Sequence, residues 1–125
     1  MAIPWEPRFR RALLDVPSFG NHPLRITLPC VGSGEAVRIY HRHRAGVMDV
    51  LRYFDAATAA RFARIPVMVG AALFDPAVPP PGQFAVYNAL TQEKKLFIEE
   101  ANHFDYPGVG ARDEALFQAA DAWFA

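Results

Sequence analysis

The sequence predicts an α/β fold with about three parallel strands and flanking helices. Three short apolar runs, at residues 10–17, 67–74 and 96–100, have the character of strands, and helical patterns separate them. The middle run is continuously apolar, which is typical of a strand buried on both faces of a parallel sheet. Right-handed crossovers would then place the three strands side by side with helices on the faces.

Between the first two strands the chain changes from loop to helix. Residues 18–34 are rich in Pro and Gly, so we expect a loop with at most one helical turn. From Glu35 the pattern becomes helical, and the next segment carries apolar residues at i, i+3, i+4 and i+7, which predict one buried face: Val47, Val50, Leu51 and Phe54. A further helix is predicted over residues 56–64, restarted by Asp55 or Thr58 and ended before Pro66.

Two more helices follow the second and third strands. The first, over residues 83–90, should place Phe84, Tyr87 and Leu90 on one side. The second, over residues 111–124, is amphipathic, and its inward residues are predicted to be Leu116, Ala119, Ala120, Trp123 and Phe124. A sheet of only three parallel strands leaves one edge without a partner, so the sequence implies a missing neighbour.

Composition excludes several classes of protein. The 125 residues are 52% hydrophobic, which fits one small globular domain or a piece of a larger one. Thirteen basic and thirteen acidic residues give no net charge, so the basic character of a nucleic-acid binder is absent. No apolar run approaches the ~20 residues of a membrane span, and a signal-peptide pattern is absent. A single cysteine, Cys30, excludes an internal disulfide, and a cytoplasmic location is the expectation.

Two polar residues follow directly on predicted strands. Asp75 ends the run at residues 67–74, and His103 lies just beyond the run at residues 96–100. Neighbouring parallel strands end at the same edge of a sheet, where ligands gather in open α/β folds. A carboxylate there can hold an imidazole so that its other ring nitrogen accepts a hydroxyl proton. Each residue could instead be an ordinary turn residue, but the pair favours catalysis, with Asp75 as acid and His103 as base.

The order of these two residues resembles that of an α/β-hydrolase, in which the triad acid precedes the histidine. Further elements make the chain similar to the acetyl xylan esterase / cephalosporin-C deacetylase family. They are Tyr53-Phe54-Asp55 before a helix, Asp75 at a strand end, Pro79-Pro80 shortly after it, Phe84-Ala85-Val86-Tyr87-Asn88 and, near the start, Asp15-Val16-Pro17. The resemblance covers nearly the whole chain in order.

What the resemblance implies is a serine carboxylic-ester hydrolase that acts on acetylated sugars or similar small esters. By motif position Asp75 corresponds to the triad acid and His103 to the triad base, and no cofactor or metal is implied. Two positions depart from the family pattern, because Asn102 and Phe104 stand where Gly and Glu are usual beside the histidine. The loop after Asp75 also lacks the cysteine that many members carry before the prolines.

The nucleophile of such a hydrolase is absent from the sequence. Neither Ser18 nor Ser33 lies in a G-x-S-x-G elbow. Residues 1–125 are therefore expected to be the C-terminal portion of one α/β-hydrolase domain, which supplies acid and base and is inactive without an N-terminal half. The alternative is a non-catalytic domain that assembles through its exposed sheet edge, as a homo-oligomer or on another chain, and buries Leu13, Leu14, Val67, Val69, Leu96 and Ile98.

Overall fold

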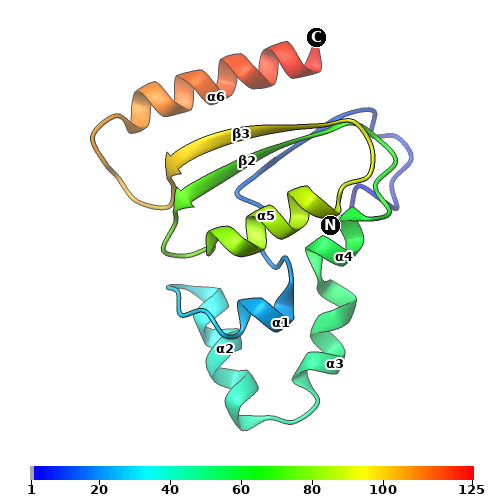
Figure 1. Cartoon of the computed structure of the whole chain (residues 1–125), viewed down its shortest axis with the longest axis vertical. Coiled ribbons are helices and arrows are strands. Elements are labelled where there is room, and N and C mark those ends of the chain that lie inside the picture. Colours follow the sequence, from blue (N-terminus) through cyan, green and yellow to red (C-terminus); the bar gives the residue numbers. More distant parts are fainter. Residues whose placement is uncertain (1) are drawn as a thin grey trace.

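The computed structural model describes residues 2–125 as a three-stranded sheet with helices on both faces (Figure 1). In chain order the elements are β1 (Ala12–Asp15), α1 (His22–Arg25), α2 (Ser33–His43), α3 (Val47–Leu51), the 3-10 helix η1 (Arg52–Phe54), α4 (Ala56–Ala60), β2 (Val67–Phe74), α5 (Pro80–Ala89), β3 (Lys94–Ala101) and α6 (Val109–Phe124). The strand order is β1-β2-β3, and both neighbouring pairs are parallel. The predicted fold class is confirmed.

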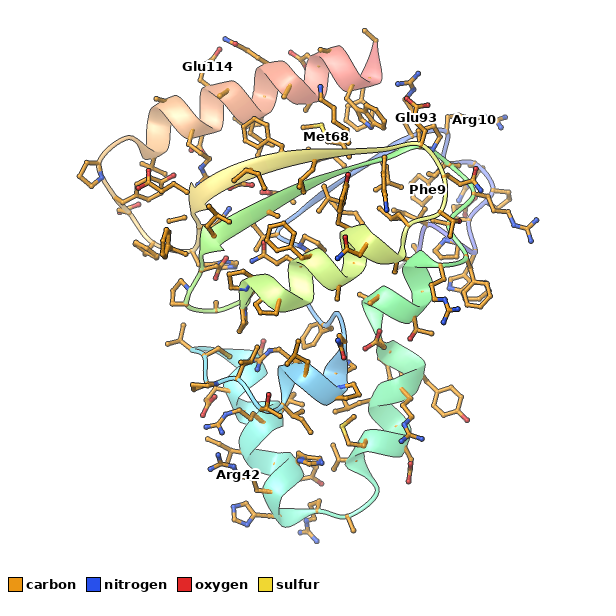
Figure 2. All side chains as sticks on the ribbon, viewed as in Figure 1. Phe9, Arg10, Arg42, Met68, Glu93 and Glu114 are labelled. Carbon is orange, nitrogen blue, oxygen red and sulfur yellow. The ribbon has the colours of Figure 1, made fainter. Side chains whose placement is uncertain are left out.

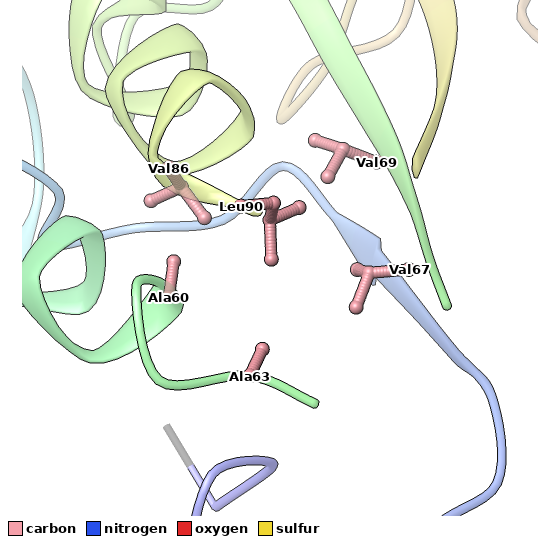
Figure 3. Close-up of a cluster of buried hydrophobic side chains, with 6 residues drawn as sticks. All are labelled: Ala60, Ala63, Val67, Val69, Val86 and Leu90. Carbon is pink, nitrogen blue, oxygen red and sulfur yellow. The ribbon is translucent and has the colours of Figure 1, made fainter. Parts of the chain in front are cut away.

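β2 covers the residues predicted for it and is the centre of the molecule. On one side of the sheet, Val67 and Val69 pack against Val86 and Leu90 from the α5 segment. Ala60 of α4 and the nearby Ala63 complete this cluster, as Figure 3 shows. Successive residues of a strand point to opposite faces, so one strand can fill two cores.

The second core lies between the sheet and α6. Met68, the residue between Val67 and Val69, packs there against Leu116 and Trp123. Figure 2 labels Met68 on the sheet beneath α6. The Trp123 indole nitrogen also donates a hydrogen bond to the carbonyl of Ala12, at 3.1 Å. α6 therefore both covers the sheet and holds β1, which starts 111 residues earlier in the chain.

The predicted apolar face at residues 47–54 is wrong for two of its members. Val50 is 59% exposed and Phe54 is 70% exposed, while Val47 and Leu51 are half-buried. For Phe54 the reason is that α3 ends at Leu51 and continues as a tighter 3-10 turn. With three residues per turn instead of 3.6, the i+7 position rotates off the common face.

Asp55 ends this irregular stretch and starts α4. One oxygen of its buried side chain accepts a hydrogen bond from the Thr58 backbone N–H at 2.7 Å, which is a helix N-cap, as the sequence suggested. The other oxygen accepts from the backbone N–H of His22 at 2.7 Å. α4 is shorter than predicted, because it ends at Ala60 rather than near residue 64.

The helix after β2 starts earlier than predicted. α5 begins at Pro80, with prolines in its first turn, where no backbone N–H is required. Its buried residues are Gly82, Gln83 and Val86, and Leu90 at the C-cap is buried as well. Phe84 and Tyr87, which were expected to share one side with Leu90, are half-buried, and Tyr87 packs against the same core cluster as Leu90.

The last helix largely follows its prediction. Leu116, Ala120 and Trp123 of α6 are buried and Ala119 packs beside them, while Phe124 is 52% exposed, contrary to expectation. Phe124 is the last residue of the helix. Figure 2 shows Glu114 on the outer side of the same helix.

The surface available for assembly is smaller than the sequence suggested. Val67 and Val69 are fully buried within the chain, so they are excluded from any interface between subunits. Ile98 is 47% exposed, and Leu13, Leu14 and Leu96 are half-buried. Within residues 2–125, β1 and β3 each pair with β2 alone, so the outer edge of each carries no strand partner.

Candidate active site

The two predicted site residues meet at the carboxyl edge of the sheet. The parallel register pairs Phe74 with Ala101, so β2 and β3 end at the same level. Asp75 follows one strand directly and His103 comes two residues after the other. Nδ1 of His103 lies 2.7 Å from Oδ2 of Asp75. The Asp75 side chain is fully buried and that of His103 is 45% exposed.

The local backbone holds the Asp75 carboxylate in place. Its Oδ1 accepts hydrogen bonds from the backbone N–H groups of Ala77 and Val78, both at 2.8 Å. Oδ2 is thereby left for the imidazole. Because an ionised carboxylate can only accept, Nδ1 of His103 carries the proton and Nε2 is free to take one from a hydroxyl group.

Gln83 stabilises the loop that carries Asp75 through two hydrogen bonds. Its Oε1 accepts from the Ala72 N–H at 2.7 Å, and its Nε2 donates to the Val78 carbonyl at 2.6 Å. The side chain is fully buried, so both ends need these partners. A lone glutamine on a helix gives no signal in the sequence, and this residue was missed.

The backbone of His103 adopts an uncommon conformation. Its φ of 63° lies in the left-handed region, which is unfavourable for a residue with a side chain. Its N–H donates to Oδ1 of Asn102 at 2.7 Å, and Nδ2 of Asn102 donates to Oε2 of Glu99 at 2.9 Å. Asn102, one of the two departures from the family pattern, therefore touches both the histidine backbone and β3.

A carboxyl pair lies behind Asn102 on the α6 face of the sheet. The Glu99 side chain is fully buried and bonds Arg112 of α6 through Oε2, while its Oε1 faces Asp15 of β1. The two carboxyl groups meet over Gly70, where a Cβ would stand 2.6 Å from Oδ1 of Asp15 and 2.7 Å from Oε1 of Glu99. Burial, together with the hydrogen bond to Asp15, raises the pKa of Glu99 to about 7.

A cavity of about 310 Å³ opens beside His103. Its lining residues come from the β1–α1 connection, the start of α2 and the loop after Asp75: Ser18, Phe19, Arg25, Val31, Gly32, Ser33, Gly34, Ala77, Val78 and His103. Both serines of the chain therefore lie on its wall, which the sequence did not indicate. In residues 2–125 no hydroxyl group hydrogen-bonds to Nε2 of His103.

Ion pairing fixes the wall formed by α2. Arg38 makes a two-pronged contact with Glu35, and the Cys30 N–H donates to the same carboxylate at 3.2 Å. These bonds, that to Arg38 first, lower the pKa of Glu35 to about 2. The charge on Glu35 therefore persists well into the acid range.

Similarity to known proteins identifies the family of this chain. Residues 36–120 match the family described as acetyl xylan esterase. The chain belongs to this family. The matched range includes Asp75, His103 and all the quoted motif elements except Asp15-Val16-Pro17. Curated protein sequences gave no match.

Solved esterases share this fold. The acetyl xylan esterase from Paenibacillus sp. R4 has a TM-score of 0.77 at 21% identity, over 97% of this chain and 40% of that one. Acetyl xylan esterase 1 from Thermoanaerobacterium sp. JW/SL YS485 has a TM-score of 0.69 at 23% identity, over 91% and 38%. A Mycobacterium tuberculosis puromycin-hydrolyzing peptidase has a TM-score of 0.63 at 18% identity, over 90% and 18%. This chain spans about 40% of the length of these two esterases.

The chain thus shares the α/β fold of these esterases, with a three-stranded parallel sheet flanked by helices. Residues 2–125 contain no group of three or more His, Cys, Asp or Glu side chains placed to hold a metal ion. None of the helices in this range is long and apolar enough to cross a membrane.

Proposed function

We propose that Asp75 and His103 are the acid and base of a serine carboxylic-ester hydrolase that removes acetyl groups from sugars or similar small esters. The observation that carries this is the 2.7 Å contact between a half-exposed imidazole and a fully buried carboxylate at two adjacent strand ends. In the reaction, Nε2 of His103 takes the proton of a serine hydroxyl as its oxygen bonds the ester carbon. The same proton then passes to the departing alcohol, and a water molecule releases acetate from the enzyme by the same two steps.

The nucleophile and oxyanion hole come, in this proposal, from a further polypeptide segment that carries a G-x-S-x-G elbow. Of the two edge strands, β1 and β3, β1 leads into the connection that lines the cavity, so its outer edge is the place proposed for a strand of that segment. Asp75 and His103 already contact each other within this chain, so in this proposal the segment has to supply only the serine and the hydrogen-bond donors. An oxyanion-hole donor alone is worth about 3 kcal/mol of transition-state stabilisation.

p-Nitrophenyl acetate hydrolysis tests this function in two steps. The 125-residue chain alone should show no turnover that depends on His103. Co-expression with an upstream genomic segment encoding G-x-S-x-G should restore turnover, and His103→Ala or Asp75→Asn should abolish or strongly reduce it. Replacement of Asp75 is expected to cost on the order of 10⁴ in kcat, as for the equivalent aspartate of serine proteases. Full turnover by the His103→Ala complex would refute the proposal.

The assay of the isolated chain also tests whether Ser18 or Ser33, the two serines on the cavity wall, acts as a nucleophile. If the isolated chain hydrolyses the ester and His103→Ala stops it, a nucleophile lies within these 125 residues. Ser18→Ala and Ser33→Ala would then identify it, since both residues line the cavity with His103.

Assembly through the same β1 edge is a second candidate function. It rests on the unpaired edge and on the half-buried Leu13 and Leu14 beside it. A dimer that pairs two copies of β1 would satisfy the free backbone groups without any catalysis. Size-exclusion chromatography with light scattering separates the two candidates, because a clean monomer at low micromolar concentration contradicts self-assembly.

A further inference from the structure

The left-handed backbone conformation of His103 requires contacts that hold it in place. A left-handed conformation is unfavourable for a residue such as histidine and persists only where its surroundings enforce it. The Asp75 contact acts on the end of the side chain and does not fix the backbone. The backbone N–H of His103 is held by Oδ1 of Asn102.

Asn102 is itself held at its other end. Its Nδ2 donates to Oε2 of Glu99, and the same oxygen accepts from Nη1 of Arg112. Glu99 belongs to β3 and Arg112 to α6, so the two anchors come from the sheet and from the helix that covers it. The side chains of Glu99 and Arg112 are 0% and 14% exposed. A chain of three hydrogen bonds therefore links the His103 backbone to the sheet and to α6.

We propose that Asn102 and Glu99 are positioning residues that fix the turn of His103 and so align its imidazole with Asp75. This inference rests on the proposed role of His103 as the base. Neither residue touches the reacting atoms, because Glu99 is sealed beneath the α6 face and Asn102 acts on the backbone of its neighbour. Asn102 does what a glycine at the same place could not, since only a side chain can accept from the N–H of the next residue and donate to Glu99.

The Nδ1 proton of His103 reports the alignment directly, without catalysis. In a ¹⁵N-labelled chain its NMR resonance is assigned as the one that His103→Ala removes and Asp75→Asn alters. Asn102→Ala should speed exchange of this proton with water by about 5- to 10-fold or abolish its signal, as expected for loss of one ordering hydrogen bond. Asn102→Asp should act similarly, because a carboxylate can accept from His103 but cannot donate to Glu99.

Variants of the glutamate separate positioning from stability. Glu99→Gln keeps an oxygen that accepts from Asn102 and Arg112, so the His103 signal should match that of the wild type. Glu99→Ala should lose the signal, and Glu100→Gln, an exposed acid on the same strand, is the matched control. Melting curves are recorded alongside, because a purely structural role would lower the melting temperature while leaving the His103 signal of the folded chain unchanged.

Two results would overturn the inference, and they differ in what else they affect. If Asp75→Asn alters the Nδ1 signal but Asn102→Ala leaves its exchange within twofold of wild type, only the positioning role fails. If the wild-type chain shows no Nδ1 signal that depends on Asp75, the acid–base pair does not form, and the proposed function fails with it.

Discussion

Replacing Glu99 with Gln should remove a large part of the pH dependence of folding. Burial, with the hydrogen bond to Asp15, raises the pKa of Glu99 from 4.5 to about 7. Since the folded pKa is the higher one, the unfolded chain loses this proton first as pH rises. The contribution of Glu99 to stability is complete below pH 4.5 and is lost as pH climbs to about 7. The difference of about 2.5 pH units corresponds to about 3 kcal/mol.

Glutamine imitates the protonated form of this side chain at every pH. Its amide can donate to Asp15 while its carbonyl accepts from Asn102 and Arg112. The free energy of unfolding of Glu99→Gln, relative to wild type, should therefore rise by up to about 3 kcal/mol between pH 4.5 and 8.

Urea titrations at several pH values measure this difference. Trp123 is a suitable fluorescence probe, because it is buried between α6 and the sheet. Glu100→Gln, which removes an exposed charge from the same strand, should keep the wild-type pH dependence. Stability curves of Glu99→Gln and wild type that run parallel across this pH range would refute the argument.

Three further predictions concern packing and charge. Trp123→Ala should cost about 3–5 kcal/mol in urea unfolding, because it empties the second core and frees β1, whereas Phe117→Ala on the exposed side of α6 should cost under about 0.5. Gly70→Ala should cost about 1–3 kcal/mol, since its Cβ would meet both carboxyl groups at under 3 Å, and an unchanged urea midpoint would contradict this contact. Arg38→Gln should raise the pKa of Glu35 from about 2 towards 4.5, which a ¹³C NMR titration of its carboxyl group measures. Because the pKa is lower in the folded chain, the stabilisation from this ion pair exists above pH 4.5 and is lost as pH falls towards 2.

The strands and the closeness of Asp75 and His103 were predictable because they follow from apolar runs and from the residues that come directly after them. A continuous apolar run between Pro66 and Asp75 allows one strand only, and β2 has those limits. The positions of Asp75 and His103 followed from the rule that parallel strands end together, and the register of Phe74 with Ala101 places them so. The motif segments that resemble the esterase family pointed independently to the same two residues, Asp75 and His103.

The residues that support the pair were not predictable, because their partners are distant or their patterns ambiguous. Glu99 belongs to a run whose polar end suggests an exposed strand terminus, yet it is buried between Asp15 and Arg112. Gln83 occupies a helix position that hydropathy assigns to solvent, but the backbone N–H of Ala72 requires an acceptor there. Such roles depend on which strands become neighbours, and a single helix or strand pattern does not carry that information.

Backbone strain is concentrated at the edge of the sheet where Asp75 and His103 lie. Four residues other than glycine have positive φ in the described chain, namely Val16, Phe19, Asn21 and His103. Val16, at a φ of 43°, is β-branched and so the costliest of them. It follows directly on β1, as His103 follows closely on β3, and Phe19 lines the cavity that His103 also lines.

Backbone hydrogen bonds hold Val16 and Phe19 in place. The Val16 N–H donates to the Gly70 carbonyl at 2.9 Å, and the Phe19 carbonyl accepts from Ala56 at 2.8 Å. Strained residues that cluster at one edge of a sheet are typical of functional sites, where the strain is offset elsewhere in the fold. Val16 and Phe19 lie in the connection after β1, which is one of the two edge strands of the sheet. If the nucleophile segment pairs with β1, as proposed, this strained connection is the part of the chain that lies next to it.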